Sequence, residues 1–172
     1  MRQAALVLTL LLSTLPLPAE EKPSCPPGQS SREEDSATGV VIQKTRLTPR
    51  PDRFDPLLIW TSDEPDSLML AVVGNGAAPK YASCHRMALF VDDRPVVLGT
   101  ADYRADSGAS RAVEYVTADI TWAEAEKLGS ARTIRYKVCN DELWADEAFV
   151  CQAREVIEAA AAWRKGKAAE KP

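Results

Sequence analysis

The stretch that decides the fold is residues 111–138, RAVEYVTADITWAEAEKLGSARTIRYKV. Its two ends, residues 111–117 (RAVEYVT) and 132–138 (RTIRYKV), alternate apolar and polar side chains. Because successive side chains of a strand point to opposite faces, this alternation is typical of a strand with one buried and one wet face. The stretch therefore predicts a mostly antiparallel sheet that has a solvent-exposed side.

A short helix is predicted between these two strands. Trp122, Ala125 and Leu128 recur at spacings of three, which places them on one side of a two-turn helix. Thr121 and Glu124 have the spacing of a capping box, in which each side chain bonds to the backbone amide of the other residue. The sequence therefore inserts a helix between strands.

Further strands and a final helix are expected on either side of this stretch. Apolar runs bounded by turn residues predict strands at residues 39–47, 57–61, 68–73, 87–91 and 95–98. Residues 51–56 contain two prolines and two aspartates and are expected to form a loop. We expect an α+β fold with about six to seven short strands, mostly antiparallel, and a helix over residues 146–164 packed on one face.

The N-terminus has the pattern of a secretory signal peptide. Arg2 is the only charge before Glu20, residues 4–17 are almost wholly apolar, and Ala19 is a small residue at which a signal peptidase could cut. A membrane-spanning helix needs about 20 apolar residues, and this run is shorter. We expect residues 1–19 to be removed, leaving a secreted or periplasmic protein without a membrane span.

Composition divides the rest of the chain into three parts. We expect a disordered polar linker over residues 20–38, a single globular domain over 39–164, and a disordered charged tail over 165–172. The net charge of −4 and the lack of a basic stripe argue against nucleic-acid binding. The expected partner is another protein or an envelope component, and the protein itself is expected to be a monomer.

The four cysteines are predicted to form disulfides, because the chain is expected to be exported and their number is even. We favour Cys84–Cys139 with Cys25–Cys151. Cys151 faces away from the apolar stripe of its helix, which leaves the cysteine of the N-terminal segment as its natural partner. The alternative is Cys139–Cys151 with Cys25–Cys84.

The same residues allow a competing metal or redox interpretation. His85 is the only histidine, and a zinc site built from Cys84, His85, Cys139 and Cys151 is conceivable. However, neighbouring residues of a strand point to opposite faces, and no C-x-x-C pair is present. We therefore assign no metal ligand and no cofactor.

A second alternative is a small secreted hydrolase. Acidic clusters occur at residues 63–66, 92–93 and 141–142, and a pair of carboxylates can hydrolyse glycosidic bonds. All three clusters lie at predicted turns, where solvated acids are common, and no G-x-S-x-G motif is present. No catalytic residue is assigned, and the alternative requires two of the clusters to meet in a cleft.

Four tryptophans remain to be explained. Trp60 and Trp122 fit ordinary packing in a strand and a helix, whereas Trp144 and Trp163 flank and end the last helix without an evident packing role. Exposed tryptophans are enriched in interfaces, so Trp144 and Trp163 are the candidate partner surface. The favoured function is a non-enzymatic, disulfide-stabilised binding domain of the cell envelope or secretome.

Overall fold

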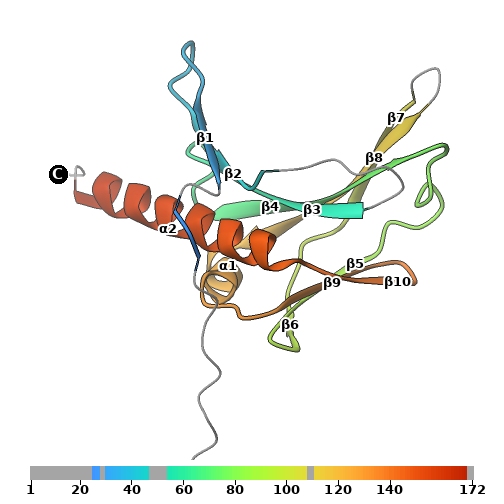
Figure 1. Ribbon diagram of the computed structural model, residues 1–172. Helices are drawn as coiled ribbons and strands as arrows, with labels where there is room; N and C mark the ends of the chain where they lie inside the picture. Colours follow the sequence, from blue (N-terminus) through green and yellow to red (C-terminus); the bar gives the residue numbers. More distant parts are fainter. Residues whose placement is uncertain (1–24, 28–29, 47–53, 108–110, 170–172) are drawn as a thin grey trace, which may run out of the picture.

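The computed structural model describes residues 25–27, 30–46, 54–107 and 111–169. Within them, ten strands form two antiparallel sheets, which are accompanied by two helices (Figure 1). The predicted α+β class is therefore confirmed.

The larger sheet has six strands in the order β1-β2-β3-β4-β8-β7. Their bounds are β1 (Ser31–Glu34), β2 (Val41–Lys44), β3 (Phe54–Thr61), β4 (Ser67–Gly76), β8 (Ala112–Thr121) and β7 (Asp102–Ser107). The longest two, β4 and β8, pair along ten residues at the centre. Their inner face buries Leu70, Val72 and Val116 almost completely, and this burial is the main stabilising contribution of the sheet.

The smaller sheet has four strands in the order β10-β9-β5-β6. Their bounds are β10 (Asp141–Trp144), β9 (Ile134–Val138), β5 (Met87–Val91) and β6 (Arg94–Val96). In β9 the residues alternate strictly between buried and partly exposed, as their sequence pattern predicts. One face of this sheet therefore belongs to the core, and the other faces solvent.

Both helices and the smaller sheet lie on the same side of the six-stranded sheet (Figure 1). Helix α1 (Trp122–Gly129) contacts β4 and β8, while α2 (Glu147–Ala169) contacts β2, β3 and α1. The smaller sheet is joined to the larger one by the Tyr136 hydroxyl, which donates a hydrogen bond of 2.9 Å to the carbonyl of Phe54. This arrangement encloses one hydrophobic core.

The structure differs from the expected fold in the number of sheets and strands and in the bounds of several elements. Two sheets replace the single expected sheet, and three strands were not predicted: β1, β7 and β10. Strand β1 lies inside the expected linker (20–38) because it pairs with β2, and α2 continues to Ala169, inside the expected tail (165–172). Strand β3 begins at Phe54, within the expected loop (51–56).

The predicted capping box does not form at the start of α1. Thr121 is the N-cap residue with an extended backbone, but its side chain makes no capping hydrogen bond. Glu124 instead accepts hydrogen bonds from the Lys127 ammonium at 2.6 Å and from the backbone N–H of Val97 at 3.3 Å. Strand β8 runs directly into this helix, and the backbone N–H of Trp122 at its start donates to the carbonyl of Asp66 at 2.9 Å.

Two disulfides connect distant parts of the chain. Cys25 is bonded to Cys151 of α2, and Cys84 is bonded to Cys139 at the turn between β9 and β10. This is the pairing that the sequence favours over the alternative. Neither helix of the described part of the chain combines the length and the apolar character that crossing a membrane would require.

Candidate functional site

A row of aromatic, cationic and proline side chains crosses the outer face of the four-stranded sheet. The strand register aligns Trp144 of β10 with Arg135 of β9, Arg135 with Phe90 of β5, and Phe90 with Pro95 of β6. We call these four residues the Trp144 row. Because partners in register project on the same side of a sheet, the row spans the whole width of this face.

Arg135 is held at the centre of the row. Its guanidinium carbon lies 4.0 Å from the ring centroid of Phe90 and 5.6 Å from that of Trp144. Two carboxylates fix it further, Glu142 at 3.2 Å and Asp93 at 3.5 Å. The side chain of Arg135 is only 17% exposed, whereas Trp144 is 55% exposed. A fixed cation thus supports a tryptophan that remains open to solvent.

The turn that carries Asp93 is held by hydrogen bonds to the segment before β9. Asp92 and Asp93 join β5 to β6 with φ of 48° and 61°, the left-handed geometry of a tight hairpin turn. One oxygen of Asp92 accepts hydrogen bonds from the backbone N–H groups of Arg132 at 3.0 Å and Thr133 at 2.9 Å. Partial burial raises the pKa of Asp92, but these bonds outweigh it and lower the pKa below its usual value.

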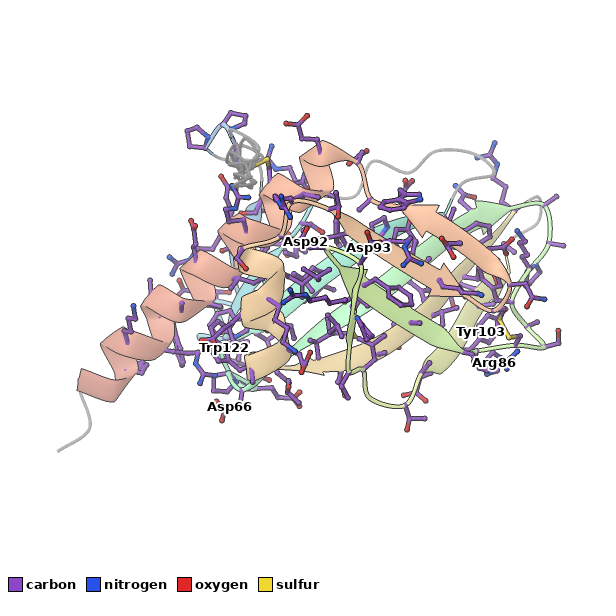
Figure 2. The ribbon with its side chains drawn as sticks, turned by 90° about the horizontal axis from the view of Figure 1, so that it is seen from below. Asp66, Arg86, Asp92, Asp93, Tyr103 and Trp122 are labelled. Carbon is purple, nitrogen blue, oxygen red and sulfur yellow. A yellow bond between two sulfur atoms is a disulfide. The ribbon has the colours of Figure 1, made fainter. Side chains whose placement is uncertain are left out.

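A cationic hollow lies on the same face, one row away from the Trp144 row. It has a volume of about 370 Å³ and is lined by Arg86, Met87, Ala88, Lys137, Cys139 and Asn140. Within the described residues, neither Arg86 nor Lys137 has an ion-pair partner. Figure 2 shows Arg86 at one end of β5 and the Asp92–Asp93 turn at the other. The face therefore combines an aromatic part with uncompensated positive charge.

The segment leading to Arg86 is fixed from two sides. The buried carboxylate of Glu114 accepts hydrogen bonds from the backbone N–H groups of Lys80 at 2.8 Å and Tyr81 at 2.9 Å. Beyond the Cys84–Cys139 disulfide, the backbone N–H of Cys139 donates to the carbonyl of Arg86 at 2.9 Å. These contacts fix the backbone position of Arg86.

Tyr81 and Asp141 form a polar contact beside this segment. The Tyr81 hydroxyl donates to the Asp141 carboxylate at 2.9 Å, and the Lys80 ammonium lies 2.8 Å from the same oxygen. Hydrogen bonds from Lys80 and Tyr81 lower the pKa of Asp141, while burial and the nearby carboxylates raise the pKa of Tyr81. Tyr81 and Asp141 thus help to anchor the segment that leads to Arg86.

The proposed zinc ligands are not brought together. Cys84 and Cys139 are bonded to each other, and Cys151 is bonded to Cys25, so all four sulfurs are in disulfides. The ring of His85 stacks on Tyr103 with centroids 4.6 Å apart. In the part of the chain that the structure describes, no three metal-binding side chains converge.

The acidic clusters do not share a cleft. Asp66 of the first cluster (63–66) pairs with Arg164 of α2 at 2.6 Å, on another part of the molecule, which Figure 2 shows near Trp122. Asp93 and Glu142 of the other two clusters meet at Arg135, but there they neutralise a cation on an exposed face. A hollow of about 540 Å³ beside β6 is lined by one carboxylate, that of Asp92.

The structure separates the two tryptophans of the expected partner surface. Trp144 lies on the exposed sheet face, whereas Trp163 is partly buried and packs edge-on against Trp60, with centroids 5.4 Å apart. Trp163 also lies 16 residues beyond the start of α2 at Glu147, about 24 Å along the helix axis. Trp163 is therefore a packing residue, and Trp144 has different neighbours.

Sequence reasoning did not single out Phe90, Arg135, Arg86 and Lys137. The alternation of residues 132–138 already places Arg135 and Lys137 on the solvent-exposed face of their strand, but it does not show which residues lie beside them. The sequence did not predict strand β10, and it is the pairing of β10 with β9 that brings Trp144 beside Arg135.

No protein-family model, curated protein or solved structure matches this chain.

Proposed function

We propose that this protein is an exported, non-enzymatic binding domain that contacts a protein partner through the outer face of the four-stranded sheet. The observation that carries the proposal is the Trp144 row, in which an exposed tryptophan is supported by a fixed arginine and a phenylalanine. Tryptophan, arginine and other aromatic residues are the types enriched in the energetically important centres of protein interfaces.

Preorganisation makes this face suitable for binding. Immobilising a flexible side chain on association costs about 0.5–1.5 kcal/mol. Arg135 is already packed against two rings and paired with two carboxylates, and its side chain is 17% exposed. A partner that covers Trp144 thus gains apolar contact without ordering the residues below it.

Charge defines the kind of partner. The whole chain has a net charge of −4, but the ion pairs of Arg135 are internal to this face, and Arg86 and Lys137 add uncompensated positive charge beside the row. A protein surface that presents apolar and acidic side chains together complements this pattern.

The roles of the cysteines and acids support a binding function over the two alternatives. The four cysteines staple the domain, and Asp93 and Glu142 neutralise Arg135. The two disulfides, together with the leader pattern of residues 1–19, also support export, because such bonds persist in oxidising compartments.

Capture with matched surface variants tests the proposal. The oxidised protein is immobilised as wild type, as Trp144→Ala and as Met69→Ala. Met69→Ala is the control, because it removes a partly exposed apolar side chain from the other sheet, where Met69 is 36% exposed. We expect a partner from the secreted or envelope fraction to bind the wild type and Met69→Ala and to lose at least about thirtyfold in affinity for Trp144→Ala, the size of one interface hot spot.

The captured protein is then purified and its affinity for each variant is measured by calorimetry. A partner that binds Trp144→Ala as tightly as wild type contradicts the assigned face. Turnover of a captured component by the purified domain contradicts the non-enzymatic assignment.

A further inference from the structure

We propose that the hollow between Arg86 and Lys137 binds a carboxylate of the partner, supplied by an extended acidic peptide whose apolar side chain covers the Trp144 row. The inference rests on the proposed function and adds the chemical class of the ligand.

A small residue opposite one of the two cations leaves room for the hollow. Ala88 of β5 lies opposite Lys137 of β9 in the register. Arg86 precedes Ala88 by two residues, and the bond from the Cys139 N–H to the Arg86 carbonyl continues the pairing to that point. Arg86 and Ala88 therefore share the outer face with Lys137, and the short methyl side chain of Ala88 leaves open space beside the Lys137 side chain.

The two cations lack a carboxylate because the nearby acids are engaged elsewhere. Glu142 lies opposite Lys137 in the register, but its carboxylate pairs with Arg135. Asp141 is bonded to Lys80 and Tyr81. Two cations that line one open hollow, with the local acids already paired, are complementary to an incoming carboxylate.

The backbone at the hollow is also held by a disulfide and a hydrogen bond. Arg86 begins next to the Cys84–Cys139 disulfide and is hydrogen-bonded to the turn that the disulfide holds. Cys139 itself has φ of 56°, a left-handed conformation that the disulfide and the hairpin maintain. The backbone positions of the two cations are thus set before a ligand arrives, which reduces the entropic cost of binding.

The distance between the hollow and the row selects a sequence pattern in the ligand. Ala88 and Phe90 are two residues apart on one strand, and so are Lys137 and Arg135 on the next, which corresponds to about 6.6–6.8 Å along each strand. In an extended peptide, residues i and i+2 project on the same side with the same spacing. The fitting pattern is an apolar or aromatic residue, any residue, and then aspartate or glutamate.

A tethered carboxylate tests the hollow without any partner. Ala88→Glu places a carboxylate in the hollow, opposite Lys137 and two residues from Arg86, and Ala88→Gln is the matched neutral control. We expect Ala88→Glu to have the higher midpoint of thermal unfolding at low salt, and the difference to vanish in the Arg86→Gln/Lys137→Gln background. Equal midpoints for the two Ala88 variants in both backgrounds contradict a carboxylate site.

A peptide titration tests the ligand class. The probes are acetyl-Trp-Gly-Glu-amide and its glutamine analogue, titrated into 15N-labelled protein by NMR. We expect the glutamate peptide to bind at least about fivefold more tightly, since charge-assisted bonds are stronger than neutral ones. The preference should disappear in Arg86→Gln/Lys137→Gln and remain in Arg104→Gln, a control on the six-stranded sheet.

Three results separate this inference from the proposed function. Equal affinity for the two peptides overturns the carboxylate site. An oligogalacturonate, which supplies carboxylates from a sugar chain, is titrated in the same way. Its binding without binding of the glutamate peptide overturns the peptide assignment. A captured partner that needs Trp144 but tolerates Arg86→Gln/Lys137→Gln overturns the inference while the proposed function stands.

Discussion

Replacing Glu114 by glutamine should destabilise the domain through two backbone bonds. Glu114 is 3% exposed, and each of its carboxylate oxygens accepts one backbone N–H, from Lys80 and from Tyr81. Glutamine has nearly the same shape but only one acceptor oxygen. Its amide group would place a donor against the second N–H, leaving that N–H buried and unpaired.

The magnitude follows from these two bonds. A hydrogen bond to a charged group contributes about 1.5–3 kcal/mol, and an unpaired buried donor costs about 1–3 kcal/mol. Since one bond survives, we expect Glu114→Gln to lower the free energy of unfolding by about 2–3 kcal/mol. Glu114→Ala loses both bonds and should cost about 3–5 kcal/mol, a large part of the 5–15 kcal/mol typical of a domain.

Urea unfolding of the oxidised protein, followed by tryptophan fluorescence, measures this loss. The matched control is Glu126→Gln, because Glu126 accepts a single exposed bond from Trp122 Nε1 at 2.9 Å and should contribute less than about 0.5 kcal/mol. Amide exchange should accelerate at Lys80 and Tyr81 in Glu114→Gln. A free energy within 0.5 kcal/mol of wild type, with unchanged protection of the two amides, would refute the assigned role of Glu114.

Asp93→Gly should raise the free energy of unfolding by about 0.5–1 kcal/mol, measured by urea unfolding, because residue 93 has a left-handed φ and its exposed ion pair contributes little. The pKa of Asp92 is lower in the fold than in the unfolded chain, so its stabilisation is present above about pH 4 and is lost as the pH falls through the folded-state pKa. Asp92→Asn should therefore flatten the acid side of a plot of urea midpoint against pH, and an unchanged slope would contradict this assignment. Gly74→Ala should cost about 1–3 kcal/mol in the same unfolding assay, because the new Cβ would lie 2.1 Å from the Phe54 ring; wild-type stability would show that the ring moves freely. Protein expressed with its leader in an oxidising compartment should lack residues 1–19 and carry two disulfides by intact mass with and without reduction, and a retained leader would count against export.

The fold class was predictable because the internal strands alternate or are wholly apolar. The three strands that were not predicted, β1, β7 and β10, are all edge strands. Their sequences are SREE, DYRADS and DELW, which contain too few apolar residues for hydrophobic periodicity to detect. Such strands form because a neighbouring strand presents backbone N–H and C=O groups for hydrogen bonding. Charged side chains on edge strands are a common protection against unwanted pairing.

The candidate site was predictable only in part, for a related reason. The sequence identified Trp144 as unexplained, but a surface is defined by side chains from strands that are distant along the chain. Phe90 and Arg135 are 45 residues apart and become partners only through the β5–β9 register. Trp163 was grouped with Trp144 because both flank one helix, and the packing of Trp163 on Trp60 could not be inferred from that helix alone.

The Cys25–Cys151 disulfide also determines how the protein responds to mechanical tension. It joins residues 126 positions apart, near the two ends of the described chain. A force applied at the two termini passes through this bond and through α2 beyond Cys151, while the sheets and the cationic hollow lie inside the loop that the bond closes. Reduction would expose the enclosed segment to the force and release roughly 400 Å of contour length. The oxidised bond therefore limits how far the domain can extend, whereas the part of α2 beyond Cys151, which buries Val156, Ile157 and Ala160, bears the force directly.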